Sequence, residues 1–242
     1  MNIITVKDYQ EMSEHAGKLL IEKVNSKRKT VLGLATGSTP EGLYAYLVKK
    51  YKEGNVSFAD VQTFNLDEYV GLDGDDPNSY MHYMKHHLFN HIDLPAQNAH
   101  LPSGTAEDLE EECNAYEKKI EDAGKIDLQV LGIGLNGHIG FNEPGTSFKS
   151  RTHIVELDAS TRQANARFFD SMEEVPTQAL TMGIASIMNS REIMLLVSGE
   201  GKAETLVKLL EGRVTEDFPA SILHEHPNVT IIADEAAYSK IK

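Results

Sequence analysis

Short apolar runs recur along the chain with helical patterns between them, and together they predict a layered fold. Five runs rich in β-branched residues read as strands: Thr30–Ala35, Val61–Leu66, Leu128–Ile133, Ile193–Val197 and Val229–Ala233. Runs that are apolar without alternation are typical of strands buried on both faces. The alternation of strands and helices predicts an α/β fold with a doubly wound, mostly parallel sheet flanked by helices.

Two of the intervening helices have a clear buried face. In the first, Thr39 is the expected N-cap and Pro40 the first helical residue, and the apolar face is Leu43, Tyr46, Leu47 and Tyr51. The second helix is expected to bury Leu109, Cys113, Tyr116 and Ile120. Because Cys113 lies on this apolar face, we expect a buried structural thiol rather than a nucleophile.

Composition narrows the class of protein. The chain has 242 residues, 40% hydrophobic and 25% charged, without repeats or long linkers, which favours a single domain over 1–242. A single cysteine excludes an internal disulfide and paired-cysteine zinc motifs, and with no secretory leader it indicates the cytoplasm. No run approaches the roughly 18 apolar residues of a membrane span. The net charge of −14 argues against nucleic acid or an anionic membrane as partner.

The richest stretch for chemistry is DLQVLGIGLNGHIGFNEPG (127–145). An apolar strand runs into glycines and then presents Asn136, His138, Asn142 and Glu143 within eight positions. The carboxyl ends of parallel strands are where open α/β sheets collect their reacting groups. The sequence therefore predicts a proton-transfer relay here.

The segments after three other strands add matching chemistry. Thr36, Gly37, Ser38 and Thr39 follow the first strand, and their backbone N–H groups can converge on an anion at a helix start. Lys202 is expected in the first turn of another helix, where a cation opposes the helix dipole and suggests an anionic ligand. Asp67 directly follows the second strand, Val61–Leu66, as a candidate general base. We expect a small phosphorylated ligand that undergoes proton transfer.

Each feature alone has a simpler reading. The TGSTP turn is more often a helix cap, Lys202 a surface lysine and Asp67–Glu68 a loop, while His138 would be catalytic about as often as not. The prediction depends on their meeting at one edge of one sheet.

A competing motif, Gly132-Ile133-Gly134-Leu135-Asn136-Gly137, matches the dinucleotide-binding pattern GxGxxG, with Asp158 about 20 residues on. That pattern requires a crossover helix, and too few residues separate Gly137 from the next β-like run at Arg151. The glycines are instead expected to bring backbone, including Gly137, close to a sugar.

Metal sites are also disfavoured. His82/His86 and His87/His91 have helical i, i+4 spacing, but no glutamate stands between either pair and no acidic third ligand is evident, so a partly exposed helix is expected. The acidic run 73–77 departs from a calcium loop at Pro77. We expect no metal and no cofactor.

Several blocks resemble the glucosamine-6-phosphate deaminase family, over essentially the whole chain: LGLATGSTP (32–40), FNLDEYVGL (64–72), GLNGHIGFNEPG (134–145), SRTHIVELD (150–158), TRQANARFF (161–169) and VSGEGKA (197–203). The resemblance implies a Rossmann-like fold, no redox cofactor, and conversion of D-glucosamine 6-phosphate and water into D-fructose 6-phosphate and ammonia in amino sugar catabolism, including N-acetylglucosamine degradation.

It also implies roles. Asp67 would move the C2 proton to C1, and His138 would open the sugar ring, oriented by Glu143 and Asn136. Phosphate ligands would come from Gly37, Ser38, Thr39, Arg167 and Lys202, with Arg167 in a lid segment at about 145–185.

Two departures from the family affect regulation and charge. Many members carry aspartate where this chain has Asn136, so Glu143 alone would supply the relay's negative charge. Hexameric relatives bind N-acetylglucosamine 6-phosphate through basic lid residues, which His153 and Val155 replace here, and through a C-terminal extension, whereas this chain stops at Lys242. We expect no such activation, and a monomer or small homo-oligomer.

Other functions stay open. 6-Phosphogluconolactonase shares the fold but differs after the histidine, and related domains sense sugar phosphates in transcription regulators. The segment before Thr30 is too short and not basic enough for a DNA-binding module. Zinc-type deaminase chemistry is excluded because Pro-Cys-x-x-Cys is absent.

Overall fold

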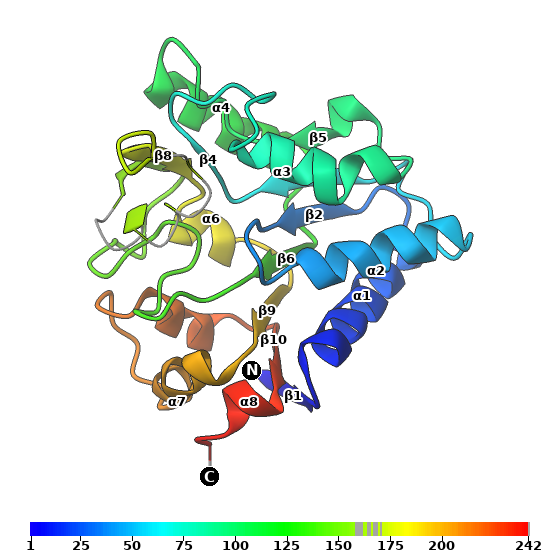
Figure 1. Cartoon of the computed structure of the whole chain (residues 1–242), viewed down its shortest axis with the longest axis vertical. Coiled ribbons are helices and arrows are strands. Elements are labelled where there is room, and N and C mark those ends of the chain that lie inside the picture. Colours follow the sequence, from blue (N-terminus) through cyan, green and yellow to red (C-terminus); the bar gives the residue numbers. More distant parts are fainter. Residues whose placement is uncertain (158–161, 164–165, 167–168, 170, 242) are drawn as a thin grey trace.

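A seven-stranded sheet runs through the middle of the molecule in the computed structural model (Figure 1), which describes residues 1–157, 162–163, 166, 169 and 171–241. Its order is β1-β10-β9-β6-β2-β3-β5, and all six neighbouring pairs are parallel. The strands are β1 (Asn2–Val6), β2 (Val31–Leu34), β3 (Gln62–Asn65), β5 (Ala99–His100), β6 (Leu128–Leu131), β9 (Ile193–Val197) and β10 (Val229–Asp234).

The predicted strands are confirmed. All five apolar segments form strands of this sheet, and β9 has the predicted bounds. The sequence reading missed β1 and β5, the two edge strands. β1 is half exposed and β5 has only two residues, so neither carries the apolar signal of a buried strand.

Helices cover both faces of the sheet (Figure 1). The α-helices are α1 (Tyr9–Ser26), α2 (Glu41–Lys52), α3 (Tyr80–His87), α4 (Leu109–Asp122), α6 (Ile184–Met188), α7 (Ala203–Leu210) and α8 (Glu235–Tyr238). Short 3-10 helices are η1 (Phe89–His91), η2 (Ala96–Asn98), η4 (Glu200–Lys202) and η5 (Pro219–Glu225).

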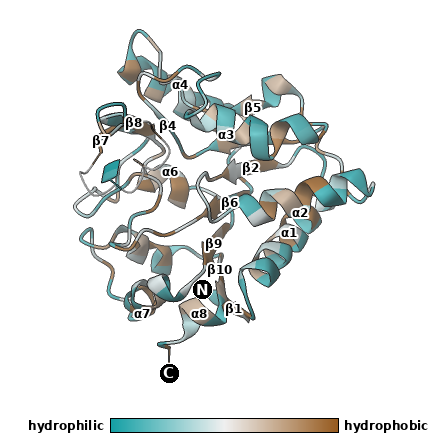
Figure 2. Cartoon of the chain, viewed as in Figure 1, coloured by the Kyte–Doolittle hydropathy of each residue, from teal (hydrophilic) through white to brown (hydrophobic). Residues whose placement is uncertain are grey.

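Each face of the sheet has its own apolar core. One core packs side chains of α1, α2 and α3 against the sheet, and the other packs α4, α6, α7, η5 and α8. Figure 2 shows apolar strands in the interior and polar residues on the outer sides of the helices. The doubly wound, mostly parallel α/β architecture predicted from the sequence is therefore confirmed.

The two expected helices exist, with corrections to a cap and to their buried faces: Tyr46, Tyr51 and Leu109 are only partly buried. α4 buries Cys113, Tyr116 and Ile120 as predicted. α2 begins at Glu41 with Pro40 as its N-cap, and no side chain caps it, so the expectation of Thr39 as N-cap is wrong. The Thr39 hydroxyl instead faces Gly132 in a neighbouring loop.

A second, smaller sheet was not anticipated. It is antiparallel, in the order β4-β8-β7, and its strands are β4 (Asp67–Tyr69), β7 (His153–Glu156) and β8 (Gln178–Thr181). β4 follows β3 after a single residue, so the chain passes directly from one sheet to the other.

The buried carboxylate of Glu117 on α4 ties this sheet to the helix layer. It accepts from the backbone N–H of Thr152 at 2.7 Å, before β7, and from the hydroxyl of Ser186, after β8. Arg151 pairs with it at 2.9 Å. Although burial raises the pKa of Glu117, the hydrogen bonds from Ser186, Thr152 and Arg151 outweigh that effect, so its net pKa is lowered. The carboxylate is thus a stable anchor.

The structure also bears on two further predictions, one about a crossover helix and one about membrane-spanning helices. Residues 132–151, all of which the structure describes, contain turns and an isolated Ile139–Asn142 bridge but no helix, so the dinucleotide pattern lacks its crossover helix. Within the described residues, no helix is long and apolar enough to cross a membrane.

Candidate active site

A cavity of about 500 Å³ opens at the carboxyl edge of the main sheet. Because the strands are parallel, the segments after β2, β3 and β6 and the lysine beyond β9 meet there. Its lining residues are Ala35, Thr36, Gly37, Ser38, Thr39, Leu66, Asp67, Tyr80, Gly132, Ile133, Gly134, Leu135, Asn136, His138, Gly140, Phe141 and Lys202.

Most residues singled out from the sequence lie in this cavity. Among the described ones, Gly137, Asn142 and Glu143 do not line it. Glu143 lies next to His138, and Gly137 packs against Phe218. Arg167 lies outside the described residues.

The loop at Thr36–Thr39 has the geometry of an anion-binding turn. Gly37 has a φ of +91°, a backbone conformation that glycine adopts without strain. The backbone N–H groups of the four loop residues, Thr36–Thr39, donate to no acceptor in the described part of the chain. Consecutive unpaired N–H groups around such a turn attract an anion.

Lys202 is the one lysine or arginine among the described residues that line the cavity. Its ammonium donates to the carbonyl of Ile133 at 2.8 Å, and burial lowers its pKa. It is the last residue of η4 and the N-cap of α7, rather than a residue inside the first turn as predicted. In a chain of net charge −14, this lysine supplies the local positive charge that an anionic ligand would need.

Asp67 lines the same cavity, at the start of β4. It is paired in register with Thr181 of β8, and only 6% of its surface is exposed. Burial, with a further contribution from the neighbouring Glu68 carboxylate, raises the pKa of Asp67 to about 8. A carboxylate desolvated in this way is a stronger base than one in water.

Glu68 points away from the cavity and caps α3. Its carboxylate accepts from the backbone N–H groups of Tyr69 and Tyr80 through one oxygen and from Met81 through the other, each at 2.9 Å. The N–H groups of Tyr80 and Met81 are donors that the start of α3 would otherwise leave unpaired. The sequence reading treated Asp67–Glu68 as one acidic pair, but the pair divides into a cavity residue and a structural cap.

The predicted relay is assembled around His138. The Nδ1 atom of His138 lies 3.1 Å from Oε1 of Glu143, within ion-pair distance but outside hydrogen-bond geometry. Asn136 donates from Nδ2 to the other oxygen of Glu143 at 2.5 Å, and its Oδ1 accepts from the backbone N–H of His138 at 3.2 Å. Gly134 leaves room for the imidazole, since a Cβ there would come within 2.3 Å of the ring.

Gly137 has a role different from the one expected. Its φ is +88°, and a Cβ there would come within 2.3 Å of the Phe218 ring. Its carbonyl accepts from the N–H of Ala220 at 2.8 Å. Gly137 therefore packs the relay turn against η5 rather than facing the cavity.

The sequence reading missed Tyr80 and misplaced Asn142. Tyr80 lines the cavity from α3, and its hydroxyl donates to that of Tyr69 at 3.2 Å. Asn142, expected among the reacting groups, is instead fully buried and donates to the carbonyls of Ile139 and Met182, at 2.8 and 2.9 Å, so it holds the turn after the histidine. The Tyr80/Tyr83 spacing on a helix next to the DEY segment was the available signal.

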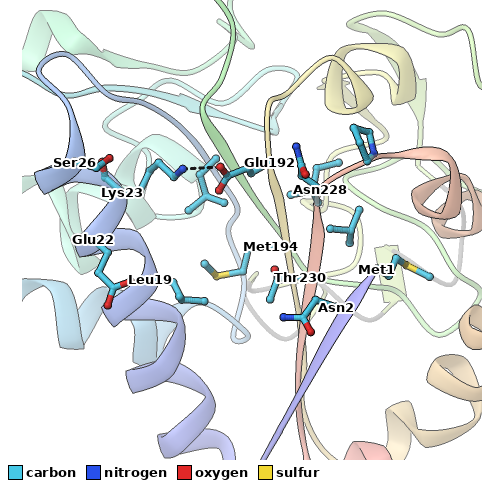
Figure 3. A pocket seen from close by; sticks show the side chains of 14 residues that line it. Met1, Asn2, Leu19, Glu22, Lys23, Ser26, Glu192, Met194, Asn228 and Thr230 are labelled. Carbon is cyan, nitrogen blue, oxygen red and sulfur yellow. Dashed lines mark hydrogen bonds and ion pairs between the residues drawn. The ribbon is translucent and has the colours of Figure 1, made fainter.

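A second and larger cavity, about 740 Å³, lies at the opposite, amino edge of the sheet (Figure 3). Its lining includes Asn2, Met194 and Thr230 near the strand starts, and α1 contributes Lys23, which pairs with Glu192 at 2.6 Å. His82, His86 and His87 lie on α3, which ends at His87, whereas His91 lies beyond it in η1. No group of three or more potential ligands within the described ranges could hold a metal.

The fold and the cavity define a class: α/β proteins with unpaired backbone N–H groups and titratable side chains in a cavity at the carboxyl edge of a parallel sheet. A family model described as glucosamine-6-phosphate isomerases/6-phosphogluconolactonase matches residues 7–232. The chain belongs to this family.

Individual relatives are similar over their whole length. A glucosamine-6-phosphate deaminase of Oceanobacillus iheyensis is 62% identical, over 100% of this chain and 96% of its own. Glucosamine-6-phosphate deaminase 1 of Bacillus subtilis is 52% identical, over 99% of each chain. A solved monomeric glucosamine-6-phosphate deaminase superposes with a TM-score of 0.97 at 52% identity, covering 99% of both chains.

The fold also occurs in more distant proteins. A 6-phosphogluconolactonase from Thermotoga maritima superposes with a TM-score of 0.76 at 21% identity, over 96% of this chain and 98% of its own. This likeness concerns the fold.

Proposed function

We propose that the protein is an isomerising deaminase that converts D-glucosamine 6-phosphate and water into D-fructose 6-phosphate and ammonia. The observation that carries the proposal is that two kinds of group meet in one cavity. Unpaired backbone N–H groups and Lys202 line it together with the buried Asp67 and with His138. Full-length relatives at 52–62% identity bear the name of this activity.

In this proposal the phosphate binds at the Thr36–Thr39 loop and Lys202. The doubly charged group is recognised by N–H donors that need no other partner, together with the ammonium of Lys202. Arg167, the further cation implied by the family resemblance, lies outside the described residues and stays a prediction.

His138 and Asp67 divide the proton transfers. His138, next to the Glu143 carboxylate, is suited to opening the pyranose ring by moving a proton between the ring oxygen and the C1 hydroxyl. Asp67 in its ionised form then removes the C2 proton and returns it to C1 through an enol-type intermediate. Water then attacks C2 and ammonia leaves, which gives the ketone of fructose 6-phosphate. The Asp67 carboxyl accepts and returns the protons in these steps.

Asn136 supports the relay in a specific way. Being a neutral amide, it orients the Glu143 carboxylate through its Nδ2 and the turn through its Oδ1, but it adds no second negative charge. The electrostatic stabilisation of a protonated His138 then comes from Glu143.

Further parts of the proposal concern the whole molecule. The chain would act as a single domain over 1–242, with residues of about 145–185 as a lid over the sugar and no cofactor. We place it in the cytoplasm, as a monomer or small homo-oligomer, without a nucleic-acid partner. The solved relative that is monomeric supports the small assembly.

One assay tests the function. Purified, EDTA-treated protein is mixed with D-glucosamine 6-phosphate, and ammonia and fructose 6-phosphate are followed together. Release of both in equal amounts is the expected result. Hydrolysis of 6-phosphogluconolactone without ammonia release would identify the lactonase branch instead, and binding without turnover would identify a sensor.

A further inference from the structure

Three tyrosine hydroxyls hold the loop at Thr36–Thr39 from its outer side. They come from α1, α2 and α3, and each donates to a different backbone carbonyl of the loop or of the residue before it. The bonds are Tyr44 to Ala35 at 2.5 Å, Tyr83 to Gly37 at 2.7 Å and Tyr9 to Ser38 at 2.9 Å. None of the three tyrosines lines the 500 Å³ cavity, so the carbonyls that they hold point away from it.

Peptide geometry turns these contacts into a statement about the N–H groups. In a planar trans peptide the C=O and the following N–H point in opposite directions. Holding the Gly37 carbonyl outward therefore directs the N–H of Ser38 inward, and holding the Ser38 carbonyl does the same for the N–H of Thr39. These N–H groups donate to no described residue.

Tyr9 makes a second bond that fixes the loop to α2. Its hydroxyl accepts from the backbone N–H of Gly42 at 2.8 Å while it donates to Ser38. The Gly42 N–H belongs to the first turn of α2 and has no partner within that helix. One oxygen thus bridges the loop and the helix that follows it.

We propose that Tyr9 and Tyr83 are positioning residues for phosphate recognition: their hydroxyls keep the loop carbonyls turned outward and the N–H groups of Ser38 and Thr39 directed at the phosphate. The inference rests on the proposed function, because it takes a phosphate monoester as the ligand of the loop. Burial raises the pKa of Tyr83, so its hydroxyl remains a donor across the physiological range.

The test removes single hydroxyls. In Tyr9→Phe and Tyr83→Phe the ring stays and the bond to the loop is lost. We expect KM for D-glucosamine 6-phosphate and the inhibition constant of inorganic phosphate to rise together, each roughly 3–10-fold per hydroxyl, with kcat within about twofold. A merely structural role would lower kcat or the fraction of folded protein without this paired change.

Tyr51→Phe is the matched control. Tyr51 lies on the last turn of α2 in the same apolar core, and its hydroxyl bonds to no described residue. It should leave KM, kcat and phosphate inhibition unchanged. Thermal unfolding of all three variants checks that they are folded.

The outcomes separate the two proposals. Folded Tyr9→Phe and Tyr83→Phe enzymes with unchanged KM and unchanged phosphate inhibition would overturn the positioning role and leave the deaminase function standing. If the wild-type protein binds inorganic phosphate but does not turn over the sugar phosphate, the function fails and the phosphate constants alone decide the positioning role. A wild-type protein that binds no phosphate would overturn both.

Discussion

The two cavities at opposite edges of the main sheet show that chemistry rather than size marks a site. The amino-edge cavity is larger, about 740 against 500 Å³, yet its charged pair Lys23–Glu192 is a partly exposed salt bridge. The smaller cavity combines unpaired N–H groups, a half-buried lysine and a carboxyl group whose pKa is raised to about 8. Such groups meet at the carboxyl ends of the parallel strands, because the segments that follow β2, β3 and β6 all line that cavity.

The largest effect that separates the two edges should come from Asp67. Asp67→Asn keeps the size of the side chain but removes the base, so kcat should fall by about 10²–10⁴-fold while substrate still binds. Steady-state kinetics with a binding measurement check this. Near-normal turnover would remove Asp67 from the proton-transfer step.

Lys202→Ala should mainly weaken binding. Loss of a charge-assisted contact of about 1.5–3 kcal/mol corresponds to a KM increase of roughly 10–100-fold for D-glucosamine 6-phosphate. D-Glucosamine without phosphate should be a very poor substrate of the wild-type enzyme. Equal rates with and without the phosphate group would contradict a phosphate site at this edge.

The pH dependence of kcat/KM reports the ionisation of Asp67 in the free enzyme. Because the base must be ionised, and its pKa is raised to about 8, kcat/KM should rise about tenfold per pH unit below that value and level off above it. A profile that is flat between about pH 6 and 9 would show that the reacting group titrates elsewhere.

The same group should affect stability in the opposite sense to a salt-bridged aspartate. Its pKa is higher in the folded than in the unfolded chain, so its contribution to stability is present below about pH 4 and is lost as pH rises toward 8. Asp67→Asn should therefore unfold at a higher temperature than wild type at pH 8.5, by at least roughly 2–4 °C, with little difference near pH 4. Parallel melting curves that keep the same separation at both pH values would argue against the raised pKa.

The smallest effect is expected at the amino edge. Glu192→Gln breaks the Lys23–Glu192 pair, which is 26% and 43% exposed at its two side chains, and should cost at most about 1 kcal/mol of stability. KM and kcat should stay within about twofold. A large loss of activity would show that the amino-edge cavity communicates with the other edge.

The sequence predicted the main sheet well because its strands are apolar runs, as β9 shows. It did not reveal β4, since the DEY segment has no apolar pattern and its pairing with β8 joins residues more than a hundred positions apart. Antiparallel contacts of that kind leave no local signal.

The helix faces show a similar limit. Apolar spacing predicted Tyr46 and Tyr51 on the buried face of α2, but it is Tyr44 that is fully buried, because its hydroxyl finds the Ala35 carbonyl. A polar group can lie in the core once it has a partner, and spacing alone does not reveal the partner. For the same reason, spacing did not predict that Glu68 accepts from the first N–H groups of α3.

The hydrogen bonds of Glu117 also limit the conformational freedom of the chain between their two partners. By holding Thr152 and Ser186 on one carboxylate, Glu117 closes the intervening chain into a ring whose ends are fixed. The entropic cost of closing such a ring grows only with the logarithm of its length. Doubling a flexible enclosed segment would therefore cost about 0.6 kcal/mol. Insertions between these two residues that leave β7 and β8 paired should therefore cost little free energy of folding.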